Sequence, residues 1–305
     1  MRTLSLTADE TMAGRTVQSL LLQELRLSGG LISRLKQYPT GICINGEKVY
    51  TTCVLHPGDV LTAEIGDHGM RSINPVSMPL EILWEDSDLL MLNKPAGLTV
   101  HADCRRPEEV TLDHALAAYL ADGEVAHPVS RLDRGTTGII TYAKNGYAHE
   151  LLRRIQHTDA FYREYRGIAL GRVTPSNGAI NLPIGFAEGS TYKRAAVCPN
   201  LNGVDQDGRI LSACTEYETL TADEKYSLLR LIPRTGRTHQ LRVHMAAIGY
   251  PLAGDWLYGN EREDARAITR PALHSYFLRF THPMTGKVLE LIAPLPDDMK
   301  QLLQK

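Results

Sequence analysis

The sequence predicts an α+β protein with a small N-terminal unit and one large domain. Apolar residues recur at helical spacing in some segments, whereas other segments are short β-branched or aromatic runs bounded by turn residues. The chain has 305 residues, of which 43% are hydrophobic and 22% charged, and this is enough for two cores. Periodicity alone supports no finer fold class than α+β.

Residues 1–65 are predicted to form the small unit. A helix is predicted within Thr16 to Leu25, and Ser28 is the predicted cap of a second short helix. An Asn45-Gly46 hairpin turn and a last strand from Val60 to Ile65 follow. Residues 66–79 mix Gly, Ser, Asn and Pro without periodicity, so we expect a domain boundary and flexible tether there.

Residues 80–305 are predicted to form the large domain. Its expected strands are Glu81 to Trp84, Leu89 to Leu92, Ile139 to Ala143 and Phe161 to Leu170. Its expected helices are capped by Thr111, Asn145 and Thr238. The first of these helices is predicted to turn Leu112, Ala115, Leu116 and Tyr119 inward, and the second to turn Arg153, Arg154 and His157 outward to solvent. Leu201 to Arg209 is expected to be an excursion between strands.

Composition limits the function classes. The formal charge of −2 and pI near 6.6 do not favour a nucleic-acid binder, although basic groups can cluster in one cleft of an acidic protein. Five scattered cysteines indicate neither a disulfide framework nor a zinc site, and His239 and His244, five apart, do not share a helical face. We therefore expect no metal. The first ten residues lack a signal-peptide pattern and no apolar run has membrane-spanning length, so a cytoplasmic location is expected.

Asp133 is the main candidate for a catalytic group. It lies between Arg131 and Arg134, and is followed by the small residues Gly135 to Gly138 and then by the predicted buried strand. A charged side chain at the mouth of a rigid strand is typical of a functional site. On residue types alone, a surface turn with exposed ion pairs fits equally well.

Four segments resemble the RluA-type pseudouridine synthases, in particular RluC- and RluD-like members with an N-terminal alpha-L RNA-binding domain. The first is HPVSRLDRGTTGIITYAK, where the family has approximately His-Arg-Leu-Asp-Arg-Asp-Thr-Ser-Gly-Leu; Ser130, Gly135 and Thr137 depart from that pattern. The others are NKPAGL, PRTGRTHQLRVHMAAIGYPLAGDWLYG and LHSYFLRFTHP. The resemblance runs from about Glu81 to Pro294.

The resemblance implies a pseudouridine synthase fold, which is a mixed, mostly antiparallel sheet with flanking helices and a central cleft, preceded by the small alpha-L domain. It implies isomerisation of uridine in RNA with no cofactor, and it makes Asp133 the catalytic aspartate. Arg242 would hold that carboxylate ionised through a bidentate pair. Tyr165 would stack on the extruded uracil, with Tyr162 as a rival. Attack on the ribose and removal of a ribose proton both remain open.

The resemblance also implies RNA contacts. The candidates in the large domain are Arg131, Arg134, Lys94, Arg237 and His239, and those in the small unit are Arg34 and Lys36. Lys94 is expected to meet a phosphate or pair with an acid. The expected partner is RNA, with large-subunit ribosomal RNA favoured over transfer RNA, and the protein is expected to be a monomer.

Two other functions remain compatible with the sequence. One is a hydrolytic glycosidase, which would need a second carboxylate beside Asp133. The other is a catalytically silent RNA-binding or ribosome-assembly factor. Retention of Asp133, Tyr165 and Arg242 favours the synthase.

Overall fold

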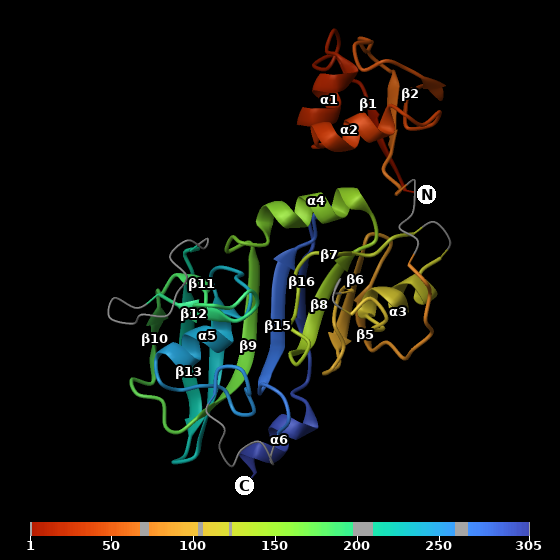
Figure 1. Ribbon diagram of the computed structural model, residues 1–305. Helices are drawn as coiled ribbons and strands as arrows, with labels where there is room; N and C mark the ends of the chain where they lie inside the picture. Colours follow the sequence, from red (N-terminus) through yellow and green to blue (C-terminus); the bar gives the residue numbers. More distant parts are fainter. Residues whose placement is uncertain are drawn as a thin grey trace.

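The computed structural model describes residues 2–67, 73–102, 106–121, 124–197, 210–259 and 268–304. Within these residues the chain forms a small sheet near the N-terminus and one large sheet (Figure 1). The segment predicted as an excursion, Leu201 to Arg209, lies outside the described residues. Of the described helices, none has the length and apolar character that a bilayer span requires.

The large sheet contains ten strands in the order β10-β13-β14-β9-β15-β8-β6-β5, with β16 beside β15 and β7 beside β8. Only the β15–β8 pair is parallel among the described strands. The strands are β5 (Ile82–Glu85), β6 (Leu89–Lys94), β7 (His127–Pro128), β8 (Thr137–Ala143), β9 (Phe161–Leu170), β10 (Asn177–Ile180), β13 (Thr215–Ala222), β14 (Tyr226–Pro233), β15 (Leu273–Thr281) and β16 (Val288–Ile292). A short pair, β11 (Ile184–Phe186) and β12 (Arg194–Ala196), stands apart.

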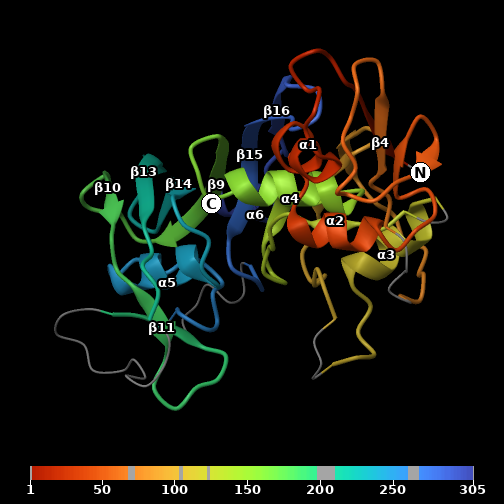
Figure 2. The same ribbon diagram turned by 90° about the horizontal axis from the view of Figure 1, so that it is seen from above.

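Two helices lie on the same side of this sheet, as Figure 2 shows. They are α3 (Leu112–Tyr119) and α5 (Gln240–Ala247). Apolar residues of both helices belong to one buried cluster with β6, β8, β9 and β14. A second cluster joins α4 (Gly146–Ile155) to β6, β8 and β15, and α6 (Asp297–Leu303) closes a third. The predicted mixed, mostly antiparallel fold is therefore confirmed.

The small unit has its own sheet and core. Its strands are β1 (Thr3–Thr7), β2 (Ile42–Ile44), β3 (Glu47–Lys48) and β4 (Val60–Glu64), in the order β1-β4-β2-β3, and its helices are α1 (Val17–Gln23) and α2 (Gly29–Leu35). Thr16 and Ser28 cap these helices, since each side chain accepts a hydrogen bond from the backbone N–H three residues later. The sequence did not predict β1, because TLSLT carries too few apolar residues to stand out.

The small unit packs on α4 of the large domain, which lies directly beneath it in Figure 1. The Tyr147 side chain of α4 belongs to the core of the small unit, and its hydroxyl donates to the Leu25 carbonyl oxygen at 2.6 Å. Arg2 forms an ion pair with the buried Asp88 at 2.9 Å. One expectation for the first helix of the large domain is wrong: Tyr119 is 44% exposed, and its hydroxyl donates to Glu85.

Candidate active site

Asp133 lies in the tight loop between β7 and β8. The loop closes on itself where the Thr136 N–H donates to the Asp133 carbonyl oxygen at 3.0 Å. At its end, Gly138 has φ +104°, and a Cβ atom there would lie 2.2 Å from the Ser275 carbonyl oxygen. Only glycine fits this position, because β8 and β15 approach each other so closely.

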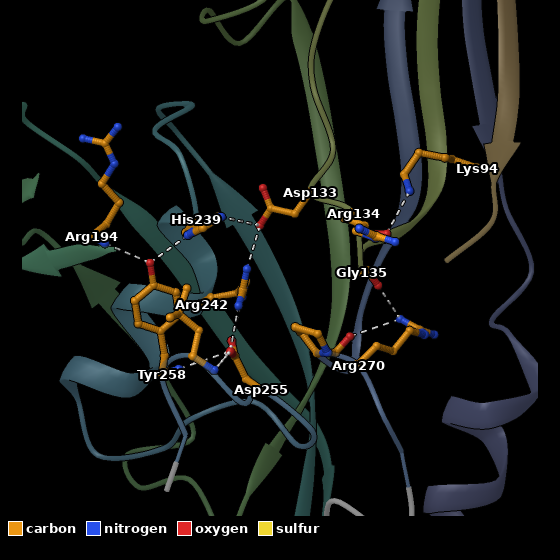
Figure 3. Close-up of polar contacts among 12 residues, drawn as sticks. Lys94, Asp133, Arg134, Gly135, Arg194, His239, Arg242, Asp255, Tyr258 and Arg270 are labelled. Atoms are coloured by element: carbon orange, nitrogen blue, oxygen red, sulfur yellow. Dashed lines mark hydrogen bonds and ion pairs between the residues drawn. The ribbon is translucent and has the colours of Figure 1, made fainter. Parts of the chain in front are cut away.

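The Asp133 loop is anchored on the side away from its carboxylate (Figure 3). The Lys94 ammonium donates to the carbonyl oxygens of Pro95 and Leu98, both at 2.8 Å, and of Arg134 at 3.3 Å. The Arg270 guanidinium, bound bidentately by Asp298, donates to the Gly135 carbonyl oxygen at 3.1 Å. These two cations bind the carbonyl oxygens of the two central residues of the turn, Arg134 and Gly135.

Lys94 is therefore not an RNA contact in this structure, and that prediction is wrong. The residue is 1% exposed, and all three of its partners are backbone carbonyls. Burial lowers the pKa of Lys94 to about 8, against an opposing effect of Asp133. The NKPAGL signature consequently supports the loop that carries the aspartate.

Arg242 of α5 reaches the Asp133 carboxylate, but not in the predicted bidentate manner. Its bidentate partner is Asp255, with Nε–Oδ2 at 2.7 Å and Nη2–Oδ1 at 2.8 Å. A third donor, Nη1, contacts Asp133 Oδ2 at 3.3 Å. The Asp255 side chain is fully buried, whereas that of Asp133 is 27% exposed. Asp255 thus fixes the guanidinium, and Asp133 stays open to the cleft.

His239 stands beside the same carboxylate. It has φ +59° and is the residue that precedes α5, so the cap predicted at Thr238 is displaced by one position. Its Nδ1 lies 2.7 Å from the Tyr258 hydroxyl, which accepts the Arg194 backbone N–H at 3.1 Å. The hydroxyl proton is then available for Nδ1, which leaves the imidazole proton on Nε2, 3.9 Å from Asp133. Burial lowers the pKa of His239 and favours this neutral form.

Tyr165 and Tyr162 lie in different hollows. Tyr165 is buried and lines the cleft that contains Asp133. Tyr162 lines a neighbouring hollow, where its hydroxyl donates to Glu164 at 2.7 Å; burial and this hydrogen bond raise the pKa of Tyr162 to about 12. Of the two candidates, only Tyr165 is brought to Asp133.

The cleft around Asp133 measures about 1070 Å³ and is strongly basic. Its charged and titratable lining, within the described residues, is Arg131, Arg153, Arg163, Arg237, Arg242, His101, His149, His157, His239 and Asp133. Asp133 is thus the single carboxylate in that lining. A protein with a net charge of −2 therefore has a cationic cleft. The two-carboxylate arrangement of a glycosidase does not occur among these residues.

The remaining predicted RNA contacts are spread over the molecule. Arg131, Arg237 and His239 line the cleft. Arg134 is outside that lining and pairs with Glu109 at 2.7 Å. Arg34 and Lys36 lie at the end of α2 in the small unit, where Arg34 is 3.7 Å from Asp67. Arg34 also approaches the start of α4, since its Nη2 would be 3.3 Å from a Cβ at Gly146.

Sequence reasoning missed four groups. Asp255 stands in the segment that carried the resemblance, but it received no role there. Arg270 gave no local signal. Arg153 points outward from its helix as predicted, but it faces the cleft. His157, predicted on the same helix, lies beyond the end of α4 and also lines the cleft. Among the described residues, no group of three His, Cys, Asp or Glu side chains is arranged to hold a metal ion.

Comparison with known proteins agrees with this geometry. Residues 88–247 match the family model described as RNA pseudouridylate synthase. An uncharacterised RNA pseudouridine synthase of Bacillus subtilis, YjbO, is 34% identical over 92% of this chain and 96% of its own length. Ribosomal large subunit pseudouridine synthase D of Vibrio cholerae is 35% identical over 88% of this chain and 85% of its own. The structure of human RNA pseudouridylate synthase domain containing 4 superposes with a TM-score of 0.58, at 25% identity, over 73% of this chain and 92% of that one.

A mixed sheet with a basic cleft and a loop-borne aspartate, together with these matches, defines an enzyme that modifies RNA. The chain belongs to the RluA family of RNA pseudouridine synthases. It is accordingly an isomerase whose substrate is RNA.

Proposed function

We propose that this synthase acts on uridine in large-subunit ribosomal RNA, with Asp133 as the group that reacts with the ribose. The observation that carries the catalytic assignment is that Asp133 is the single carboxylate among the described residues lining the cleft. Its contact with the buried Arg242 at 3.3 Å supports the ionised form that either mechanism needs. The proposal for ribosomal RNA is supported by the name of the Vibrio cholerae relative, which states that substrate, and by the separate small unit.

Two routes fit a single carboxylate. In the first, Asp133 bonds to C1′ of the ribose and the electron pair of the N1–C1′ bond leaves with the uracil. In the second, Asp133 takes the proton from C2′, and N1 leaves as a C1′–C2′ double bond forms. In both, the base turns and C5 bonds to C1′; in the first route this displaces the Asp133 carboxylate, so that the bond between Asp133 and C1′ breaks. C5 then loses its proton to solvent and N1 takes one up. The second route also returns the proton to C2′.

The neighbouring side chains have distinct proposed roles. Arg242, fixed by Asp255, holds the Asp133 carboxylate in place. Tyr165 offers a ring for the extruded base, a contact of about 1–3 kcal/mol that offsets part of the cost of unstacking. The Nε2–H of His239 is directed at the same carboxylate and is close enough to bind it after a small movement.

Release of tritium from RNA that carries uridine labelled at C5 tests the assignment, because bonding at C5 expels that label. We expect release with the parent protein on a large-subunit ribosomal RNA transcript, and a loss of about a thousandfold or more with Asp133→Asn. Asp297→Asn on the exposed end of α6 is the matched control and should retain full release. A transfer RNA transcript tested alongside decides between the two substrate classes.

Two outcomes would contradict the proposal. Release that survives Asp133→Asn would assign the chemistry to another group. No release from either RNA, with binding intact, would favour a silent RNA-binding factor. Deuterium at C2′ separates the two routes, since only proton removal from C2′ breaks that bond and is slowed by the heavier isotope.

A further inference from the structure

One wall of the cleft collects basic side chains that the proposed mechanism does not use. The end of α4, the start of β9 and the loop before α5 meet there, and each contributes to the lining. We call this group the basic corner; it consists of Arg153, His157, Arg163 and Arg237. The corner belongs to the cleft of Asp133, but none of its four side chains forms a hydrogen bond or ion pair with Asp133 or Arg242 in the described structure.

The basic corner has hydrogen-bond donors to spare. In the described part of the chain, Arg153 and His157 have neither an ion pair nor a side-chain hydrogen bond, although both are exposed to the cleft. The Arg163 Nη2 donates to the Gln156 carbonyl oxygen at 3.2 Å, but its buried Nε has no partner there. Arg237 donates through Nε to the Ser212 carbonyl oxygen at 3.0 Å, and its two Nη groups have no hydrogen-bond partner among the described residues.

These groups lie close enough to act on one another. A Cβ at Gly236 would be 3.0 Å from the His157 ring, so the loop that carries Arg237 touches that histidine. After burial, the charges of Arg163, Arg237 and Arg153 are what lower the pKa of His157. The nearest carboxylate along the chain, Asp159, is paired with Arg234 at 2.7 Å in the neighbouring hollow. No ion pair within the described part of the chain therefore balances the positive charge of the basic corner.

We propose that the basic corner binds one internucleotide phosphate of the RNA next to the target uridine. This proposal rests on the proposed function, because it takes RNA in the Asp133 cleft as given. Guanidinium groups bind phosphate oxygens through paired N–H donors, and groups supplied by three different elements fix the anion in position. The phosphate would set where the RNA strand enters the cleft, and thereby which nucleotide reaches Asp133.

Binding of the phosphate should also favour protonation of His157. An anion beside His157 favours the imidazolium, which opposes the three guanidinium groups that now disfavour it. His157 therefore takes up a proton when RNA binds, and affinity rises as the pH falls through the region of the ordinary histidine pKa of about 6.5. A residue with a purely structural role would not produce this coupling.

The test is RNA binding by the full chain, followed through the anisotropy of a fluorescein-labelled oligouridylate over a range of KCl concentrations. Arg153→Ala should weaken binding about five- to tenfold and reduce the slope of log affinity against log salt by about one. His157→Gln should flatten the pH dependence. Lys300→Ala removes one exposed positive charge from α6, away from the cleft, and should leave affinity, slope and pH dependence unchanged.

A second measurement locates the phosphate. Oligonucleotides with one neutral methylphosphonate linkage, placed at each position in turn, should bind the parent more weakly at one position. That loss should be smaller in Arg153→Ala, because one partner of the phosphate is already gone. Equal losses in parent and variant, or an unchanged salt slope, would overturn the proposal.

The two proposals fail in different ways. If the linkage effect is smaller in Arg153→Ala than in the parent but no RNA releases tritium, binding of phosphate by the basic corner is supported and the proposed reaction is rejected. If tritium release depends on Asp133 but the methylphosphonate linkage weakens binding equally in parent and variant, the proposed reaction is supported and phosphate binding by the basic corner is rejected. Because Arg153 is exposed, its substitution leaves the core intact, and thermal unfolding of the variant checks this.

Discussion

Arg242 is held by two carboxylates with different surroundings. Asp255 binds it through two short hydrogen bonds inside the protein, whereas Asp133 meets one nitrogen at 3.3 Å from the wall of the cleft. The bidentate pair neutralises the buried guanidinium and fixes its orientation. The positive charge of Arg242 is consequently directed at Asp133 Oδ2, while the Asp133 side chain stays partly exposed and its Oδ1 faces the cleft where substrate would bind.

The first prediction concerns this pair. Asp255→Asn leaves the buried Arg242 guanidinium with only its single contact to the Asp133 carboxylate, so the free energy of unfolding should fall by about 3 kcal/mol or more in urea titrations. Asp298→Asn is the matched control, since Asp298 binds Arg270 in the same bidentate geometry but is partly exposed. Its loss should be about 1 kcal/mol. Equal losses would contradict the importance of burial.

The second prediction concerns His274, which is fully buried between Thr137 and the Ala293 carbonyl oxygen. Burial lowers the pKa of His274 to about 4, from 6.5. Between these values the unfolded chain binds a proton that the folded chain does not, so stability falls as the pH drops from about 6.5 towards 4. The full effect is on the order of 3 kcal/mol.

Urea titrations over this pH range test that expectation. The free energy of unfolding of His274→Asn should depend on pH less steeply than that of the parent. The exposed His56 provides the control, and His56→Gln should keep the slope of the parent. A His274→Asn slope identical to that of the parent would show that other groups produce the acid sensitivity.

At the scale of elements, the β8–β15 pair positions the reactive loop. These strands run parallel, and Gly138 is opposite Ser275 in their register. Because β8 begins immediately after the loop, the close approach of β8 and β15 at Gly138 fixes the position of the loop that carries Asp133. The apolar run of β8 could be recognised from sequence. That β8 pairs with β15, which begins 136 residues further along the chain, could not be predicted from a local pattern.

The third prediction follows from this approach. Gly138→Ala places a methyl group 2.2 Å from a backbone oxygen at a positive φ, and should destabilise the fold by about 2–4 kcal/mol and reduce activity. In contrast, a Cβ at Gly30, within α2, would have no neighbouring atom within 4 Å, and Gly30→Ala should stabilise the protein by about 0.5–1 kcal/mol. Thermal unfolding compares the two; a harmless Gly138→Ala would contradict the close approach.

Helix α4 serves three neighbours at once. Tyr147 and Leu151 contact the small unit, Ala148 and Leu152 pack against the large sheet, and Arg153 faces the cleft. Residues three to four apart share a helical face, so ten residues suffice for three surfaces. Hydrophobic periodicity predicted that Arg153 points away from the core, but it does not distinguish a side chain in bulk solvent from one in a cleft.

On the scale of the whole molecule, the small unit and the cleft lie on different faces of the same helix. The described contacts between the two parts include Tyr147 with Leu25, Arg154 with the Arg26 carbonyl oxygen, and Arg2 with Asp88. RNA bound by both parts would therefore span α4.

The fourth prediction tests that placement. Tyr147→Ala opens a cavity in the core of the small unit and removes a hydrogen bond, which should cost about 3 kcal/mol and expose residues 2–67 to protease before the large domain. Tyr50→Ala, in the same unit but 83% exposed, should have little effect. Limited proteolysis and binding of a ribosomal RNA transcript compare the variants. Unaltered cleavage of Tyr147→Ala would contradict the docking of the small unit on α4.

Local sequence was sufficient to predict the described helices other than α6, most helix caps, the strands β4, β5, β6, β8 and β9, and the aspartate loop. These features depend on residues within about one or two turns of each other, so that a local pattern such as Ser28 before α2, or the apolar run of β8, specifies them. Tyr165 and Arg242, in contrast, became candidates only through the resemblance of their segments to the family. Long-range packing did not change these assignments.

Which charges meet depends on the tertiary structure alone. Lys94 is buried because the carbonyl of Arg134, forty positions later, closes over it, and Arg270 reaches Gly135 across a still longer separation. Asp255, and not Asp133, is the bidentate partner of Arg242. Arg153 faces a cleft because β9 and the α5 loop arrive beside α4. The fate of a charge depends on desolvation and on partners brought from distant segments, and neither is encoded in a local pattern.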